Sequence, residues 1–181
     1  MSGKTHIVGG LALATTSSFL LHICEPTTNA ELVTWGITYA TPAMIGAVAL
    51  DIDHWNSTAA NFNIFTKILS IFIRILCGHR GMLHSPFFLI VLTVLFGWVY
   101  SIYPIQWVGN MITGFLIGCV SHLVLDLLNP TGLPLLFPFT WENGRPKKYH
   151  FFSFKQGGIM EVLLFCFLFS VTAIMLYEWM V

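Results

Sequence analysis

The stretch Ser121-His122-Leu123-Val124-Leu125-Asp126 places two ionisable side chains inside a run, Asn110 to Leu128, that otherwise reads as a membrane-spanning helix. His122 and Asp126 are four residues apart, about one helical turn, so both project from one face. An imidazole and a carboxylate on one face can share a cation, or they can bond to each other. In a bilayer both groups are costly unless they are paired, coordinated or turned toward a polar cavity. The fold must therefore bring other polar groups to this pair.

The composition is that of an integral membrane protein. Of the 181 residues, 56% are hydrophobic and 9% are charged, whereas an average soluble domain carries about 25% charged residues. The formal net charge is zero, so no overall field attracts nucleic acid, and we expect no nucleic-acid partner. The four cysteines form no CxxC pair, which favours buried thiols over a disulfide or zinc framework. We expect a single all-α domain over residues 1–181.

The apolar runs predict a membrane-embedded helical bundle with about five transmembrane helices. The expected spans are Ile7–Ile23, Leu32–Leu50, Pro86–Tyr103, Asn110–Leu128 and Ile159–Val181. A further apolar run, Ile64–Leu76, is too short to cross a bilayer and carries Lys67 and Arg74, which predicts an amphipathic helix lying in the interface. Pro42 and Gly46 predict a kink in the second span.

The basic residues indicate how this bundle is oriented. With five spans, all eight Lys and Arg residues fall in the amino terminus and in the segments 51–85 and 129–158, and the opposite loops contain none. The positive-inside rule therefore places the amino terminus and both large segments in the cytoplasm.

Residues that commonly bind metals or phosphate gather at this same end of the bundle. They are His6 before the first span, Asp51, Asp53 and His54 at the end of the second, His79, Arg80 and His84 before the third, and His122 and Asp126 in the last turns of the fourth. Imidazoles and carboxylates in this mixture suit zinc, manganese or iron. More than four candidate ligands predict more than one ion, with Asp51 or Asp53 as the natural bridging ligand. Taken singly, His122 reads more simply as a satisfied polar residue and Arg80 as a lipid-headgroup contact, but the gathering of all of them favours a metal site.

In their order along the chain, these motifs resemble the YdjM-type family of bacterial inner-membrane proteins. The resemblance rests on His6, Leu50-Asp51-Ile52-Asp53-His54, Gly78-His79-Arg80-Gly81-Met82-Leu83-His84-Ser85, Ser121 to Asp126, and Asn129-Pro130-Thr131-Gly132-Leu133-Pro134-Leu135-Leu136-Phe137-Pro138. The family is regarded as metal-dependent hydrolases, distantly similar to zinc-dependent phospholipase C. The resemblance implies a multi-pass protein of the bacterial inner membrane, with metal roles for His6, Asp51, Asp53, His84, His122 and Asp126. Leu50 and Met82-Leu83 depart from the usual family residues, but neither departure removes a ligand.

The expected function is metal-dependent hydrolysis of a phosphoester in a lipid or lipid-linked substrate at the cytoplasmic face. Two or three divalent ions are expected, most simply zinc, with manganese or iron as alternatives. His79 and Arg80 would supply an acid and a planar cation to the phosphate, and His54 a further ligand or the partner of one.

Two other classes of protein remain open. A non-enzymatic metal-binding transporter or scaffold is one, although a transporter usually has polar residues near the bilayer midplane. A partner-docking protein that acts through the basic loop Arg145–Lys155 is the other, and deletion of that loop would separate it from a metal enzyme.

The charge pattern predicts that the loop containing Asn143 is cytoplasmic and that the loop containing Thr28 faces the opposite side. A cysteine introduced at Asn143 should resist a membrane-impermeant thiol reagent in intact cells, whereas a cysteine at Thr28 should react. The reverse labelling pattern would overturn the orientation.

Overall fold

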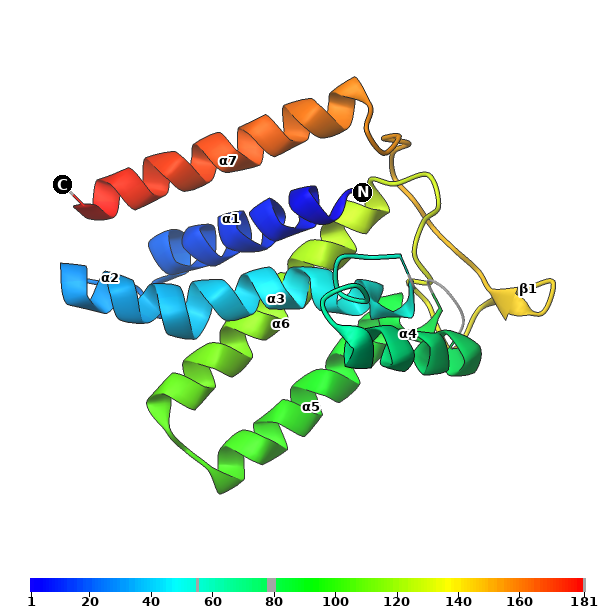
Figure 1. Ribbon diagram of the computed structural model, residues 1–181, viewed down its shortest axis with the longest axis horizontal. Coiled ribbons are helices and arrows are strands. Elements are labelled where there is room, and N and C mark those ends of the chain that lie inside the picture. Colours follow the sequence, from blue (N-terminus) through cyan, green and yellow to red (C-terminus); the bar gives the residue numbers. More distant parts are fainter. Residues whose placement is uncertain (55, 78–80, 181) are drawn as a thin grey trace.

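The computed structural model describes residues 1–54, 56–77 and 81–180. The regular secondary structure of the described residues is almost entirely helical, which confirms the all-α expectation (Figure 1). In chain order the elements are α1 (Gly3–Leu21), α2 (Asn29–Trp35), the π-helical η1 (Gly36–Ala40), α3 (Thr41–Ala49), the 3-10 helix η2 (Leu50–Asp53), α4 (Ile64–Cys77), the 3-10 helix η3 (Met82–His84), α5 (Pro86–Ile102), α6 (Gln106–Leu127), β1 (Trp141–Glu142), β2 (Arg145–Pro146) and α7 (Ile159–Met180).

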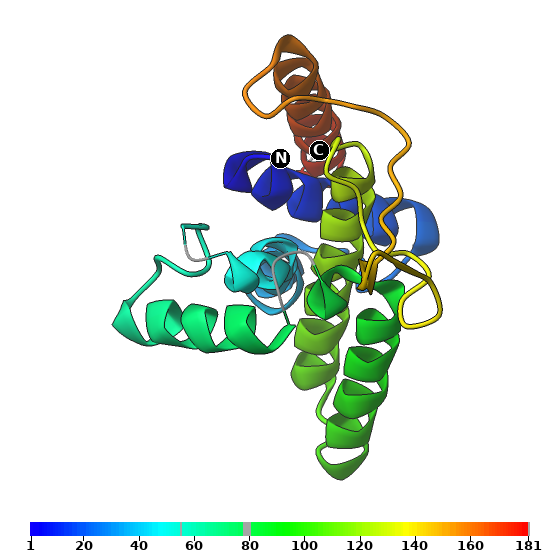
Figure 2. The ribbon, with the colours of Figure 1, turned by 90° about the vertical axis from the view of Figure 1, so that its right-hand side faces the viewer.

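Helix α1 lies at the centre of the bundle, in contact with α3, α6 and α7 (Figure 1). Helix α5 packs on α6, and α4 contacts η2 while projecting to one side, away from α5 and α6 (Figure 2). The start of α1, the end of α3 with η2, the end of α6 and the start of α7 lie toward one end of the molecule, on the right of Figure 1. Most of the residues that the sequence predicts to bind metal belong to the elements at this end of the molecule.

Three helical stretches among the described residues are long and apolar enough to cross a membrane. They are Asn29–Asp53, with 25 residues, and Gln106–Leu127 and Ile159–Met180, with 22 each. Helix α5 is apolar but has 17 residues. Helix α1 has 19 residues and is rich in Gly, Ser and Thr. These small and polar residues lower its hydropathy, and they suit a helix surrounded by other helices rather than by lipid.

Several boundaries differ from those expected, including the starts of α1 and α6, and a local hydrogen bond explains the earlier start of α1. Helix α1 begins at Gly3 because the Ser2 side chain accepts a hydrogen bond from the Thr5 backbone N–H, a standard N-cap. His6 therefore lies inside the first helix rather than before it. Likewise, η2 continues the second span, so Asp51 and Asp53 lie within a helical turn rather than after the helix.

The irregularity in the second span lies upstream of the predicted kink at Pro42 and Gly46. It is the π-helical segment η1, where the Thr41 hydroxyl donates to the Gly36 carbonyl at 2.8 Å. A wider turn before a proline relieves the clash that its ring would make with the preceding turn. Gly46 lies in regular helix, and its role is to allow close packing.

Helices α3 and α6 approach so closely that their backbones touch at glycines. A Cβ atom added at Gly118 would lie 2.0 Å from the Ala43 carbonyl oxygen, and one at Gly114 would lie 2.2 Å from that of Tyr39. A Cβ atom added at Gly46 would likewise lie 2.1 Å from the Phe115 carbonyl oxygen. Small residues four apart on one helix are a common device for close packing in membranes. This contact fixes α6 against the end of α3.

The two faces of α4 differ sharply. Phe65 and Ile75 are 78% and 74% exposed, whereas Ser70 is fully buried. With Lys67 and Arg74 on the same helix, the exposed apolar face is typical of a helix that lies in the membrane interface.

The segment between α6 and α7, expected to be a loop, folds back on the end of α6. It contains the hairpin β1–β2, whose turn residues Asn143 and Gly144 both have positive φ, as a tight two-residue hairpin requires. Backbone N–H groups of Phe151 and Phe154 donate to the Leu127 and Leu128 carbonyls at 2.9 Å. These bonds satisfy carbonyls that the end of a helix leaves open.

The Gly118 contact generates a stability prediction. Gly118→Ala should lower the free energy of unfolding by about 1–3 kcal/mol or more. The reason is that the new methyl group meets backbone that cannot move without separating α3 from α6. Gly97→Ala is the matched control, since nothing lies within 4 Å of a Cβ atom at Gly97 on α5. Thermal unfolding in detergent measures both variants, and equal melting temperatures would contradict the packing account.

Candidate metal centre

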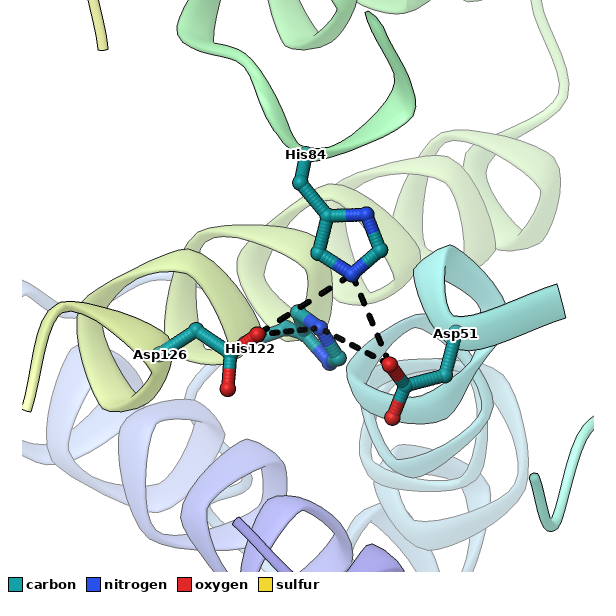
Figure 3. Close-up of side chains that lie close together, drawn as sticks. All are labelled: Asp51, His84, His122 and Asp126. Carbon is teal, nitrogen blue, oxygen red and sulfur yellow. Dashed lines mark ion pairs between the residues drawn. The ribbon is translucent and has the colours of Figure 1, made fainter. Parts of the chain in front are cut away.

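Four side chains from three separate segments meet at the end of the bundle where the sequence predicts them. They are Asp51 from η2, His84 from η3, and His122 and Asp126 from α6 (Figure 3). One ligand atom from each lies within 4.8 Å of all the others. His84, His122 and Asp126 are completely buried, and the Asp51 side chain is 17% exposed. This arrangement is suited to one metal ion.

The distances around this cluster agree with that reading. His84 Nε2 lies 3.4 Å from Asp51 Oδ1 and 4.0 Å from Asp126 Oδ2. His122 Nε2 lies 3.8 Å and 3.6 Å from the same two oxygens. These separations exceed ordinary N–H···O hydrogen bonds of about 2.7–3.2 Å. A tetrahedral ion with bonds of about 2.0–2.1 Å holds neighbouring ligand atoms about 3.3–3.4 Å apart. The residues therefore fit a divalent ion once the site contracts, since the candidate ligand atoms lie up to 4.8 Å apart.

The orientation of His122 is set by the backbone of α3. Its Nδ1 lies 2.7 Å from the Ala47 carbonyl oxygen, and a carbonyl can only accept a hydrogen bond. Nδ1 must therefore carry the proton, and in the neutral ring Nε2 presents its lone pair to Asp51 and Asp126. Metal-binding histidines commonly donate their other ring nitrogen in this way. The close approach of α3 and α6 makes this bond possible.

His84 is held between two carboxylates. Its Nε2 faces Asp51, and its Nδ1 lies 3.4 Å from Asp53 Oδ2. Burial lowers the pKa of His84, but its interactions with these two carboxylates outweigh burial and raise the pKa to about 9. A metal ion that binds Nε2 must displace a proton from this ring. Ser85, which caps α5 by accepting from the Phe88 N–H at 3.1 Å, fixes His84 just outside that helix.

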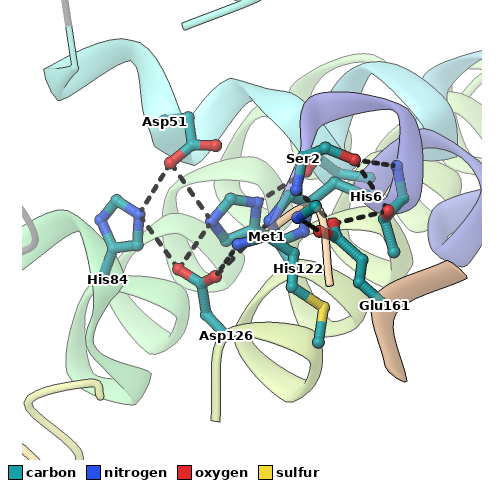
Figure 4. Close-up of polar contacts among 11 residues, drawn as sticks. Met1, Ser2, His6, Asp51, His84, His122, Asp126 and Glu161 are labelled. Atoms are coloured by element: carbon teal, nitrogen blue, oxygen red, sulfur yellow. Dashed lines mark hydrogen bonds and ion pairs between the residues drawn. The ribbon is translucent and has the colours of Figure 1, made fainter. Parts of the chain in front are cut away.

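His6 lies on the other side of His122, with the two rings stacked at a centroid distance of 4.1 Å (Figure 4). It is completely buried, and neither of its ring nitrogens makes an ordinary hydrogen bond. Its Nε2 lies 3.5 Å from Asp126 Oδ1, as does the amino nitrogen of Met1. The two oxygens of Asp126 thus face different neighbours, one toward His84 and His122 and the other toward His6.

The remaining predicted site residues fall outside the four-ligand cluster. Asp53 is buried and contacts His84 rather than reaching the centre of the cluster. His54 lines an adjacent cavity. His79 and Arg80 lie outside the described residues. His22, which belongs to no motif, pairs with Glu25 at the far end of α1.

A polar cavity of about 290 Å³ adjoins the cluster through Asp51. Its walls are formed mainly by amide and hydroxyl side chains and by the amino-terminal residues; they include His54, Asn56, Ser57, Thr58, Asn129, Thr131 and Gln156. The segments that directly follow the second and fourth spans thus each contribute to the walls. The cavity gives polar molecules a place beside Asp51.

A buried carboxylate on α7 was missed by the sequence analysis. Glu161 is 3% exposed. Its Oε1 accepts from the Ser2 N–H at 2.6 Å and the Thr5 hydroxyl at 2.8 Å, and its Oε2 accepts from the Gly157 N–H at 2.6 Å (Figure 4). It ties the start of α1, and so His6, to α7. An acidic residue in the first turn of a membrane-spanning helix was the available signal.

The fold and site define a class: an all-α membrane protein with a buried cluster of His and Asp residues that can bind a metal ion. Residues 1–180 match the model of the family described as YdjM inner membrane protein. The chain belongs to this family.

Individual relatives agree with that assignment. The chain is 32% identical over 141 residues to the uncharacterized protein YvsG of Bacillus subtilis (strain 168), which covers 77% of this chain and 75% of that protein. It is 33% identical over 101 residues to the inner membrane protein YdjM of Escherichia coli (strain K12), covering 55% of this chain and 48% of that protein. No solved structure matches the chain.

The geometry predicts that His122→Ala and Asp126→Ala lose bound metal, whereas His22→Ala keeps it. Removing His122 also takes one polar neighbour away from the buried Asp126 carboxylate, which keeps His6, His84 and the Met1 amino group nearby, so some stability is lost as well. Asp53→Asn should weaken metal affinity about 10–100-fold, because it orients a ligand without being one. Elemental analysis of purified protein gives the metal content.

His22→Ala is the matched control, because His22 is exposed and lies at the opposite end of α1. Size-exclusion chromatography must first show that each variant is folded. Full metal content in a well-folded His122→Ala protein would contradict the site.

Proposed function

We propose that this protein is a membrane-bound, metal-dependent hydrolase that cleaves a phosphoester of a lipid or lipid-linked substrate. The observation that carries the proposal is the convergence of Asp51, His84, His122 and Asp126 within 4.8 Å in a buried place. Three carboxylates, the buried Asp53 and Asp126 and the partly exposed Asp51, concentrate negative charge there. Burying such charge is costly without a compensating cation, so a divalent ion suits both the geometry and the charge.

The cavity beside Asp51 favours a catalytic site over a structural one. Structural zinc sites are closed by their protein ligands, whereas catalytic sites keep access for water or substrate. Asp51 is the one member of the four-ligand cluster that is partly exposed, and it lines the 290 Å³ cavity. Water and a phosphate group therefore have a route to the cluster.

Asp51, His84, His122 and Asp126 would hold the first ion, and His6 would be a ligand of a neighbouring ion. A divalent transition metal, most simply zinc, supplies Lewis-acid stabilisation of a phosphoryl oxygen and makes water acidic enough to act as a nucleophile near neutral pH. Asp53 and the Ala47 carbonyl orient the two imidazoles of the first set.

The other assignments follow from the sequence. We propose that His79 and Arg80 contact the phosphate, with Arg80 supplying a planar, two-pronged donor, and that His54 acts from the cavity wall. A lipid substrate suits a site at the end of membrane-spanning helices, because such a substrate diffuses to it within the bilayer. The one-sided basic residues support placing the site at the cytoplasmic face.

Hydrolysis assays test this function. Purified protein in mixed micelles should release the headgroup phosphate or alcohol from phosphatidic acid or phosphatidylglycerol, stop after chelation, and recover when zinc or manganese is restored. Asp51→Asn should lower the rate, because it removes a charged candidate ligand that faces the cavity. The control is Glu142→Gln, which changes an exposed carboxylate in the hairpin.

Two results would count against the function. One is a folded, metal-loaded protein that hydrolyses no lipid phosphoester in such a panel. The other is hydrolysis that survives chelation undiminished.

A further inference from the structure

An apolar groove of about 240 Å³ lies between helices α1, α6 and α7. Its walls include Gly9 and Leu13 of α1, Ser121 and Val124 of α6, and Phe167 and Val171 of α7. The hydroxyls among its lining residues belong to Thr16 and Ser121, and the Thr16 hydroxyl already donates to the Met175 sulfur at 3.6 Å. The groove thus offers packing surface rather than hydrogen bonds to an occupant.

In a bilayer, hydrocarbon would surround the groove. Two of its three walls, α6 and α7, are stretches long and apolar enough to span a membrane. Val124 and Phe167, from opposite walls, are 53% and 63% exposed, so the groove opens outward. In a bilayer the molecules available to enter it are lipid chains.

One end of the groove adjoins the candidate metal centre. Ser121 and Leu125 in its α6 wall directly precede His122 and Asp126, and Gly9 follows His6 by three residues. A Cβ atom at Gly9 would lie 2.5 Å from Leu125 Cδ1, so α1 and α6 converge there and close the groove from the side. The groove therefore begins within about one helical turn, 5.4 Å, of these ligands.

We propose that this groove binds one hydrocarbon chain of a lipid, and that it positions the polar end of that lipid at the metal centre. Along α1 it extends from Gly9 to Thr16, about 10 Å of helix, which accommodates part of an acyl chain. Identifying the bound lipid as substrate rests on the proposed function; the binding itself does not.

A chain that moves from the bilayer into the groove gains no hydrophobic free energy, because lipid tails are as apolar as the groove. Its binding must therefore come from close packing and from the contacts of the headgroup. The groove therefore selects a lipid by the shape of its chain and by the position of its headgroup. Overfilling it with a larger side chain should exclude the lipid without unfolding the protein, since two of its lining side chains are largely exposed.

The test uses the full chain in phosphatidylcholine vesicles that contain a trace of phosphatidylglycerol with a photoreactive diazirine in one acyl chain. After irradiation, peptide mass spectrometry should find labelling at 121–125 on α6 and 167–171 on α7. Excess unlabelled phosphatidylglycerol should suppress this labelling, as a saturable site requires, whereas labelling of the exposed face of α5 should persist because bulk lipid surrounds it.

Two variants on opposite walls, Val124→Trp and Val171→Trp, should each reduce groove labelling to the level of α5. The matched control is Val94→Trp, on an exposed position of α5, which should leave groove labelling unchanged. Because the two variants lie on opposite walls, one of them still tests the groove if the other fails to fold. Melting temperatures show whether each variant is folded.

Labelling is measured in the presence of chelator, so it does not depend on catalysis. Groove labelling that is not saturable, or that neither tryptophan variant reduces in folded protein, overturns the proposal. Saturable labelling in a protein that hydrolyses no lipid would support lipid binding in the groove and would contradict only the proposed hydrolase function.

Discussion

The structure depends on how it compensates carboxylates that are buried at one end of a membrane bundle. Asp51, Asp53 and Asp126 lie around two imidazoles, and the solvent that would normally stabilise them is largely excluded. In such a place an unpaired charge destabilises the fold by several kcal/mol. His84 meets part of this need by holding a proton between Asp51 and Asp53. A divalent cation bound in the cluster would displace a proton from His84 and compensate the carboxylates in its place, which would link the stability of this end of the bundle to metal binding.

Close helix packing makes that compensation geometrically possible. Gly114 and Gly118 let α6 press against the backbone of α3, and the same approach brings the Ala47 carbonyl within 2.7 Å of His122. Glu161 performs a related task for α1 by binding Ser2 and Thr5. The ligands are thus held by backbone contacts and buried hydrogen bonds, and the groove between α1, α6 and α7 is a by-product of where these helices converge.

Much of this end of the molecule could be predicted from the sequence. The spacing of His122 and Asp126 put both on one face, and the alternation of spans brought Asp51 and His84 to the same end. The boundaries of α1 and η2 were less predictable, because they depend on the Ser2 cap and on a helix that continues through Asp53. The Ala47 bond, the fold-back of residues 129–158 and the role of Gly46 arise from tertiary packing, which no local pattern records. The low hydropathy of α1 likewise reflects its position among other helices.

The most direct test of the central claim is the location of a bound metal. Anomalous X-ray diffraction from crystals of the zinc- or manganese-loaded protein shows where the ion lies. We expect a peak within about 2.0–2.2 Å of His84 Nε2, His122 Nε2 and an oxygen of Asp51 or Asp126. Metal-loaded crystals in which these atoms surround no peak, or in which the metal lies elsewhere on the chain, would contradict it.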